Sequence, residues 1–401
     1  MLFSGLEILP PDPILGVAQA FAADPSPLKV DLGIGIYRDE QGRSPVLSCV
    51  KSAELSLQQN QASKAYQSSA GNPEFNLATA ELIFGANHKA LTDRRAFSIQ
   101  TPGGTGALRV AADFLRVRDP STIIWLPDPT WATHQPIFAA CGLATRKYPY
   151  YDAASAQLLF DEMTKALSEA QPGDIIVMHG CCQNPSGADL NEGQWRQIAA
   201  LIKSIGAVPF IDLAYQGFGD GLDADAGPVR MLADSLPEML VASSNSKNFA
   251  LYRDRVGALT TVAQDRKDGQ IARQHILQAI RANYSMPPDH GATIVALILG
   301  DADLRAAWEQ ELDVMRTRIK TMRDMLSQEL TSLTGVDHGF IAGQRGLFAK
   351  LGLTPAEVAY LRQVHHIYIT LSGRMNIAGL SANNVRRVAE GIAAARARAA
   401  A

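Results

Sequence analysis

The fold and chemistry of this chain are indicated first by the stretch Ser243-Ser244-Asn245-Ser246-Lys247-Asn248-Phe249. It follows the apolar run Met239–Ala242, which predicts a short buried strand. A lone lysine is usually a solvated surface charge, but ligands of open α/β sheets collect at the carboxyl ends of such strands. A lysine amine forms an imine with an aldehyde, and the hydroxyls before Lys247, together with Arg255, suit a phosphate. Pyridoxal 5'-phosphate (PLP) carries both groups, so the stretch indicates a PLP site.

Around this stretch, from about residue 45 to residue 264, strand-like and helix-like segments alternate. The expected strands are Ala96–Gln100, Thr122–Leu126, Ala144–Tyr148, Asp174–His179, Ala207–Asp212, Met239–Ser243 and Val256–Val262. Several are nearly continuous apolar runs, which are typical of strands covered by helices on both faces. The alternation predicts an α/β fold with a large, mostly parallel sheet.

The C-terminal part has a different pattern. A long, charged helix is expected at Ala302–Glu329, short strands near Phe340, Phe348 and Ile367, and a last helix from Ala382. This layout is α+β. We therefore predict a large α/β domain at residues 45–314, a smaller α+β domain formed by residues 12–44 and 315–401, and an N-terminal arm at residues 1–11.

The bulk composition excludes several classes of protein. The 401 residues are 47% hydrophobic and 19% charged, with a net charge of −3, which gives no reason to expect nucleic acid or a membrane surface as partner. No run approaches the roughly 18 apolar residues of a membrane helix, and Met1–Pro13 lacks the pattern of a signal peptide. The four cysteines match neither a disulfide framework nor a zinc spacing. We expect no metal site and a reducing, cytoplasmic compartment.

A glycine-rich turn, Thr101-Pro102-Gly103-Gly104-Thr105-Gly106, joins an expected strand to an expected helix. Backbone N–H groups at such a turn can approach an anion closely, and the helix N-terminus adds favourable partial charge. The turn is neither G-x-G-x-x-G nor G-x-x-x-x-G-K-[ST]. It therefore indicates a cup for a monophosphate and disfavours a nicotinamide dehydrogenase.

Polar residues at other strand ends fit the remaining parts of PLP. Asp212 can pair with a protonated pyridine nitrogen, and Tyr215 and Asn184 can hydrogen-bond the phenolic oxygen. Trp131 is a candidate platform for the ring, and His134 can support Asp212 from behind. Each also has an ordinary structural interpretation: a loop cap, an Asn-Pro turn, a core tryptophan or a structural histidine.

Two arginines outside the α/β region suit a substrate with two carboxylates. Arg374 follows an apolar segment and Arg281 lies in an expected helix. Only arginine offers a planar fork for bidentate contacts with carboxylates, although a solvated surface arginine remains the simpler interpretation of Arg281.

The ordered motifs of the chain resemble those of the class I aminotransferases, in the aspartate and aromatic amino-acid group. They are LGIGIY at 32–37, TPGGTGALRVAADF at 101–114, HGCCQNPSG at 179–187, AYQGF at 214–218, SKNFALY at 246–252 and RANYS at 281–285. The resemblance extends from residue 12 to residue 379 and implies the PLP-dependent transferase fold. It also implies a homodimer whose subunits share active sites.

The resemblance assigns a role to each matching residue. Lys247 would form the Schiff base with PLP and move the proton, Asp212 would hold the pyridinium, and Tyr215 and Asn184 the phenolic oxygen. The phosphate would be bound by Gly103, Gly104, Thr105, Ser244, Ser246 and Arg255, with Tyr66 reaching it from the neighbouring subunit. Trp131 would stack on the ring. Arg374 would bind the substrate α-carboxylate, Arg281 of the neighbouring subunit the distal carboxylate, and Gly35 would lie in the segment that closes over substrate.

Three positions depart from the aspartate-specific pattern: Met286 stands in place of a polar residue, Gln183 in place of a histidine and Asn245 in place of a bulky residue. A flexible, apolar Met286 favours aromatic substrates in addition to aspartate. We predict a ping-pong transaminase that moves the amino group of L-aspartate, L-glutamate, tyrosine and phenylalanine to a 2-oxo acid such as 2-oxoglutarate. The alternatives are a strictly aspartate-specific enzyme and a PLP lyase or decarboxylase on the same fold. A PLP-binding sensor would need a helix-turn-helix segment, and the sequence shows none.

Overall fold

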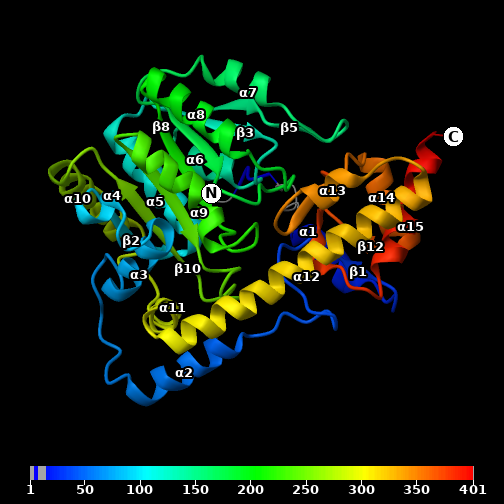
Figure 1. Cartoon of the computed structure of the whole chain (residues 1–401), viewed down its shortest axis with the longest axis horizontal. Helices are drawn as coiled ribbons and strands as arrows, with labels where there is room; N and C mark the ends of the chain where they lie inside the picture. Colours follow the sequence, from blue (N-terminus) through cyan, green and yellow to red (C-terminus); the bar gives the residue numbers. More distant parts are fainter. Residues whose placement is uncertain (1–3, 8–14, 401) are drawn as a thin grey trace.

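A seven-stranded mixed sheet forms the core of the larger region of the molecule, on the left in Figure 1. The computed structural model describes residues 4–7 and 15–400, so the predicted arm at 1–11 lies outside the described residues except for 4–7. The strand order is β2 (Ala96–Pro102), β10 (Val256–Val262), β9 (Met239–Ser244), β8 (Val208–Leu213), β7 (Ile175–His179), β3 (Ile123–Asp128) and β4 (Ala144–Pro149). Strand β10 runs in the direction opposite to that of the other six strands, which are parallel to one another. All seven predicted strands are found, and the predicted mostly parallel sheet is confirmed.

Helices cover both faces of this sheet, because side chains of a strand alternate between the two faces. Val177 of β7 packs in one core cluster, whereas Ile176 and Met178 pack in the other. The first face is covered by α5 (Gly103–Arg118), α6 (His134–Ala140) and α10 (Arg266–Asn283). The second is covered by α3 (Pro73–Phe84), α7 (Phe160–Leu167), α8 (Glu192–Ile205), α9 (Leu222–Ser235) and α11 (His290–Gly300). The short elements α4 (Lys89–Thr92), β5 (Tyr151–Asp152) and β6 (Gln157–Leu158) complete this region.

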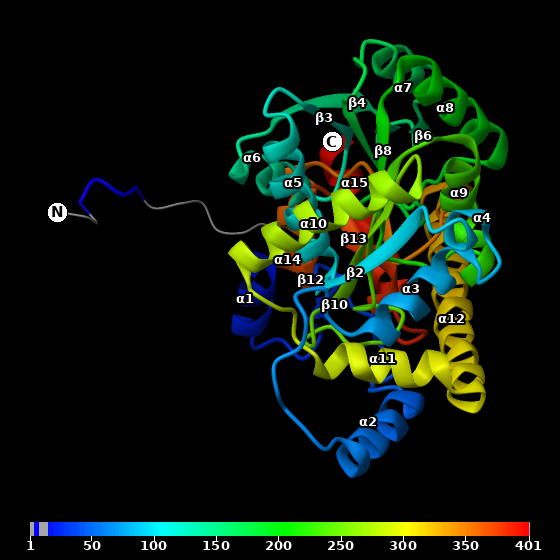
Figure 2. The same cartoon turned by 90° about the vertical axis from the view of Figure 1, so that its left-hand side faces the viewer.

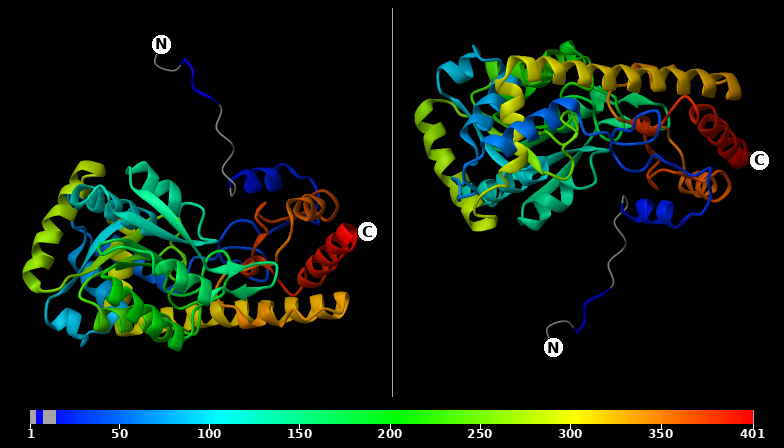
Figure 3. Two further views of the ribbon diagram at one scale, coloured as in Figure 1. Left: turned by 90° about the horizontal axis from the view of Figure 1, so that it is seen from above. Right: turned by 90° about the horizontal axis from the view of Figure 1, so that it is seen from below.

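One helix joins the sheet region to the C-terminal part. Helix α12 (Ala302–Thr334) runs along one side of both regions (Figures 1 and 3). Its N-cap is Asp301, whose carboxylate accepts the backbone N–H groups of Asp303 and Leu304, and its C-cap is Gly335 with φ 69°. The predicted domain boundary at 314/315 falls inside this continuous helix, and the division into domains stays a prediction.

The C-terminal part is built from small elements together with the N-terminal segment. Strand β1 (Val30–Asp31) pairs in parallel with β12 (Ile367–Tyr368), and β11 (Phe348–Lys350) pairs with β13 (Arg374–Asn376). Around them lie α1 (Leu15–Ala23), α13 (Gly339–Gly343), α14 (Pro355–His365), η1 (Ile377–Gly379) and α15 (Val385–Ala400). Helix α2 (Ser48–Asn60) packs beside α11 (Figure 2). Within the described ranges, no helix is long and apolar enough to cross a membrane.

Two local predictions are corrected. Phe340 lies in the one-turn helix α13 and not in a strand, because a single turn is enough to bury Ile341 in the core. The last helix begins at Val385 and not at Ala382, because Ser381 and Asn384 form a turn in which the Asn384 side chain accepts the Ser381 N–H. The strands predicted near Phe348 and Ile367 are found as β11 and β12.

Candidate active site

A cavity of 240 Å³ lies at the carboxyl edge of the central sheet. Strands β3, β7, β8 and β9 are parallel, so the residues that follow them meet at this edge. Strand β10 is antiparallel, and therefore Arg255, which precedes it, lies at the same edge. The lining comprises Gly35, Gly104, Thr105, Leu108, Trp131, His179, Asn184, Asp212, Ala214, Tyr215, Ser244, Ser246, Lys247, Tyr252, Arg255, Phe348 and Arg374.

Lys247 enters this cavity three residues after the end of β9. Its ammonium lies 5.0 Å from the centroid of the Tyr215 ring. Burial is the main cause that lowers the pKa of Lys247 to about 8; the positive charges of Arg255 and Arg374 act in the same direction, and Asp212 opposes them. The free amine that a nucleophile or a general base requires is therefore far more accessible near neutral pH than in an ordinary lysine, although the charged form still predominates below pH 8.

Asp212 lies at the end of β8 and is buried. Burial alone would raise its pKa, but the hydrogen bond and charge of His134, followed by the charges of His179 and Lys247, outweigh burial and lower it. His134 Nε2 lies 3.0 Å from Asp212 Oδ2, which confirms the predicted support from behind. Thr130 Oγ1 lies 2.8 Å from the other ring nitrogen of His134. The site thus holds a buried carboxylate in its charged form.

His179 stands beside Asp212, because these two residues are paired in the parallel register of β7 and β8. It is buried, and neither of its ring nitrogens has a hydrogen-bond partner among the residues that the structure describes. Burial lowers the pKa of His179 to about 4, so its imidazole is neutral at neutral pH. His179 was not identified as a site residue from the sequence. It could have been found from its position, because it is a polar residue at the end of a predicted strand, as Asp212 is at the end of another.

The glycine-rich turn forms a cup at the N-terminus of α5. A Cβ on Gly103 would lie 2.7 Å from an Arg255 Nη atom, and one on Gly104 would lie 3.2 Å from Ser244 Cβ. Arg255 has φ 56°, an uncommon conformation for a residue with a side chain, and its Nη1 donates to Ser246 Oγ at 3.2 Å. The hydroxyls of Ser244 and Ser246, the guanidinium of Arg255 and the N-terminus of α5 thus surround one small space. Side chains at Gly103 and Gly104 would fill this space. This donor set suits a phosphate.

Arg374 lines the same cavity and is 6% exposed. Its Nη2 donates to the Gly33 carbonyl at 2.7 Å and its Nη1 to Asn184 Oδ1 at 3.3 Å, while its Nε has no partner within the described part of the chain. The guanidinium carbon lies 4.3 Å from the Phe348 ring centroid. Burial lowers the pKa of Arg374. This cation can therefore accept a carboxylate from the cavity.

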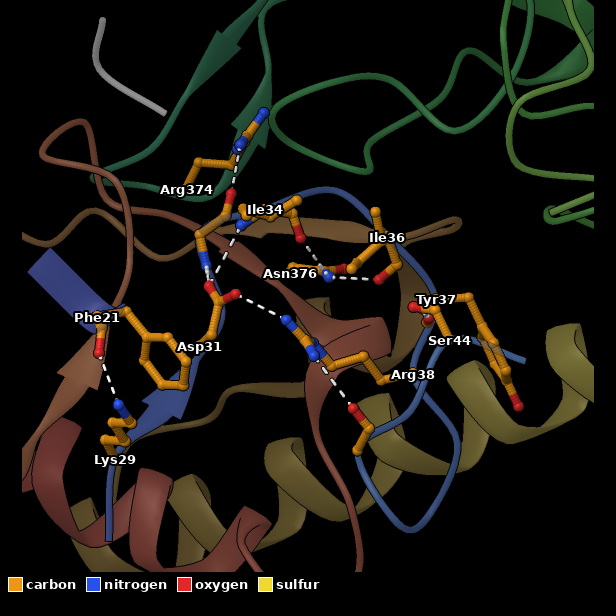
Figure 4. Close-up of polar contacts among 12 residues, drawn as sticks. Phe21, Lys29, Asp31, Ile34, Ile36, Tyr37, Arg38, Ser44, Arg374 and Asn376 are labelled. Atoms are coloured by element: carbon orange, nitrogen blue, oxygen red, sulfur yellow. Dashed lines mark hydrogen bonds and ion pairs between the residues drawn. The ribbon is translucent and has the colours of Figure 1, made fainter. Parts of the chain in front are cut away.

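The segment with Gly35 is held against the C-terminal part (Figure 4). Asn376 Nδ2 donates to the carbonyls of Ile34 and Ile36 at 2.7 and 2.8 Å. Asp31 pairs with Arg38 at 2.8 Å and accepts the N–H of Gly33. These contacts place Gly35 over the cavity as part of one unit with Arg374.

Most residues predicted for the site meet in this cavity, and Gly103 adjoins it through Arg255. Two do not. Tyr66 is 95% exposed and Arg281 is exposed on α10, where it bonds Ser285. Besides His179, sequence reasoning missed Tyr252 and Phe348, which look like ordinary buried aromatic residues in the sequence. The Tyr252 hydroxyl accepts the N–H of Tyr37 at 2.9 Å.

Comparison with known proteins agrees with this geometry. The model of the family "Aminotransferase class I and II" matches residues 27–392, and the chain belongs to this family. An aspartate aminotransferase of Salmonella typhi is 47% identical over 98% of this chain and 100% of the relative. An aromatic-amino-acid aminotransferase of Pseudomonas aeruginosa is 44% identical over 98% of each chain.

A solved structure extends the likeness to three dimensions. The aromatic-amino-acid aminotransferase of Burkholderia pseudomallei, covalently bound to pyridoxal phosphate, has a TM-score of 0.96 and 41% identity. The match covers 98% of this chain and 99% of that one. The resemblance inferred from the motifs and the expected fold are therefore confirmed.

Proposed function

We propose that the chain is a PLP-dependent transaminase that moves the amino group of L-aspartate, L-glutamate and aromatic L-amino acids to a 2-oxo acid such as 2-oxoglutarate. One observation carries the proposal: a buried lysine amine with a lowered pKa, a charged buried carboxylate and a phosphate cup line a single cavity with an arginine whose Nε has no hydrogen-bond partner among the described residues. The family and its aspartate, aromatic and tyrosine aminotransferase members support both substrate classes.

The residues of the cavity fit PLP. Gly103, Gly104, Thr105, Ser244, Ser246 and Arg255 would hold the phosphate, since a Cβ on either glycine would fill the cup. Asp212 would hold the ring nitrogen, Tyr215 and Asn184 the phenolic oxygen, and Trp131 would stack on the ring. When bound, PLP withdraws electrons from the substrate Cα and so makes its proton labile.

The protein side chains then perform three tasks. The Lys247 amine would act as the base that takes the proton from the substrate Cα and holds it, a role favoured by its lowered pKa of about 8. Arg374 binds the α-carboxylate and so fixes the orientation of the Cα–H bond. The segment that contains Gly35, together with the Phe348 side chain, covers the substrate and excludes water.

We further propose a homodimer with shared sites. Its support is that Tyr66 and Arg281 are exposed in the single chain and line no part of its cavity. In the dimer, Tyr66 would reach the phosphate and Arg281 the distal carboxylate of the neighbouring subunit. The four cysteines are free, which supports a reducing, cytoplasmic compartment.

The direct test is the visible absorption spectrum of the purified protein with PLP. L-Aspartate and then L-phenylalanine should each convert the band of the lysine-bound cofactor to that of its amino form, and 2-oxoglutarate should restore it. A response to aspartate alone would indicate a strictly aspartate-specific enzyme. A stable band that neither amino acid shifts would overturn the transaminase and leave the lyase and decarboxylase alternatives.

A further inference from the structure

A second pocket, of 510 Å³, shares no lining residue with the candidate active site. It lies against α8 and α9, and its lining includes Cys181, Asp189, Asp225 and Arg345. Glu192 and Asp220 also line it, so four carboxyl groups face one arginine, which itself pairs with Asp220. A pocket with this excess of acidic groups attracts cations.

Two adjacent thiols, of Cys181 and Cys182, lie together, and Cys181 lines this pocket. Side chains of adjacent residues usually diverge, but Cys182 has φ 53°, a left-handed conformation that is uncommon outside glycine. Cys181 Sγ, Cys182 Sγ and a carboxylate oxygen of Asp225 all lie within 4.8 Å of one another. Two sulfurs bound tetrahedrally at about 2.3 Å from a metal ion lie about 3.8 Å apart, which this limit permits.

The carboxylate of Asp225 retains capacity for a further ligand. It accepts the backbone N–H groups of Gly217, Gly219 and Asp220 at 2.8 to 2.9 Å. A carboxylate has about four acceptor positions, so roughly one remains. Both thiols are reduced and buried, with Cys181 5% and Cys182 1% exposed, and Cys181 opens onto the pocket.

We propose that Cys181, Cys182 and Asp225 form a binding site for one thiophilic divalent ion with a filled d shell, of the Zn²⁺ and Cd²⁺ class. Thiolates are the preferred ligands of such ions, and a water from the pocket completes a tetrahedral set. Binding forms two metal–sulfur bonds and one metal–oxygen bond, and it releases the two thiol protons to solvent without any change of oxidation state. The sequence spacing does not predict this site because Asp225 comes from α9, more than forty residues beyond the cysteines.

The test is a titration of the PLP-loaded protein with CdCl₂ alone, in buffer free of small thiols. Native mass spectrometry and the ultraviolet sulfur-to-cadmium charge-transfer band give stoichiometry and ligand type. We expect one ion per chain with that band. The double variant Cys181→Ser/Cys182→Ser should lose the ion and the band, and Asp225→Asn should keep the band with affinity lowered roughly tenfold or more.

The matched control is Cys141→Ser, because Cys141 also lies beside a carboxylate, Asp113 at 3.2 Å, but has no second thiol. This variant should bind Cd²⁺ as the wild type does. Single Cys181→Ser and Cys182→Ser variants, each expected to lose roughly tenfold or more in affinity, keep the test decisive if the double variant does not fold. Absence of binding to wild type, or binding that survives both single substitutions unchanged, overturns the proposal.

Discussion

Burial lowers the pKa of Lys247, which makes its amine more reactive but also lowers the stability of the folded protein. An ordinary lysine has a pKa of about 10.4 in the unfolded chain, and burial lowers that of Lys247 to about 8 in the folded protein. Below pH 8 both states carry the charge, and the folded state bears the cost of burying it. Between pH 8 and about 10.4 the folded lysine is neutral first, so stability rises with pH through this window.

It follows that Lys247→Met should stabilise the PLP-free protein at pH 7, by about 1–3 kcal/mol. This gain should shrink as pH rises above 8 and vanish near the pKa of the unfolded lysine. Urea unfolding from pH 7 to 10.5 measures both effects. Lys203→Met, at an exposed position of α8, is the control and should show no such pH dependence. A gain independent of pH would mean that packing, and not the buried charge, is responsible.

At the scale of elements, Gln183 joins two loops of the site. Its Nε2 donates to the Pro129 carbonyl at 2.8 Å, and its Oε1 accepts the Ser186 N–H at 2.8 Å. One loop carries Trp131 and the other carries Asn184. Gln183, which stands in place of a histidine, therefore fixes the loop of Trp131 relative to the loop of Asn184.

Gln183→Leu leaves the Ser186 N–H and the Pro129 carbonyl without their partner. We expect a loss of about 1–3 kcal/mol of stability and, through displaced Asn184 and Trp131, weaker retention of PLP. Unfolding curves and equilibrium dialysis against free PLP measure the two effects. The exposed Gln41→Leu serves as control. Normal PLP affinity in Gln183→Leu would show that the two loops hold their positions independently.

At Gly35 the N-terminal segment approaches the Phe348 side chain so closely that there is no room for a larger residue. A Cβ there would lie 2.5 Å from Phe348 Cζ, and the Phe348 ring is buried and cannot move freely. Gly35→Ala should lower kcat/KM, by up to roughly 10²-fold, because it separates the covering segment from the C-terminal part. Gly343→Ala, where no atom lies within 4 Å of the added Cβ, is the control. Equal kinetics for the two variants would argue against this close contact in solution.

For the whole molecule, the proposed dimer can be tested by mixing subunits that carry different substitutions. In a mixed dimer of Lys247→Ala and Arg281→Ala chains, one shared site would combine Lys247 of one subunit with Arg281 of the other, and activity on L-aspartate should rise above that of either variant alone. A mixture of Lys247→Ala and Arg374→Ala chains should stay inactive, because both residues line the cavity of the same chain. Failure of the first mixture, with dimers formed, would contradict shared sites.

Substrate choice also belongs to this scale, since it depends on the neighbouring subunit. Arg281→Ala should reduce kcat/KM for L-aspartate by roughly 10- to 100-fold, the worth of a charged hydrogen bond. The value for L-phenylalanine should stay close to that of the wild type, because an aromatic ring makes no ion pair. Steady-state kinetics with both donors measures this. A large loss for both would count against dual use.

Local patterns in the sequence were enough to locate the seven sheet strands and the residues at their carboxyl ends. Apolar runs, the glycine-rich turn and the polar residues after each run are short-range information, and a parallel arrangement brings such strand ends to one edge. Lys247, Asp212, Asn184 and Thr105 could therefore be predicted to meet. Phe340 was assigned wrongly because a short apolar run does not distinguish a strand from one helical turn.

The sequence by itself determined the fold class, the family and the chemical groups of the candidate site, since these follow from local pattern and ordered motifs. Only the tertiary structure decided which distant segments meet. Asn376 bonds the carbonyl of Ile34, 342 residues earlier, and His179 faces Asp212 through strand register. The same holds for the Cys181–Cys182 pair opposite Asp225. Such contacts depend on how whole elements pack, and the burial that lowers the pKa of Lys247 exists only once they have packed.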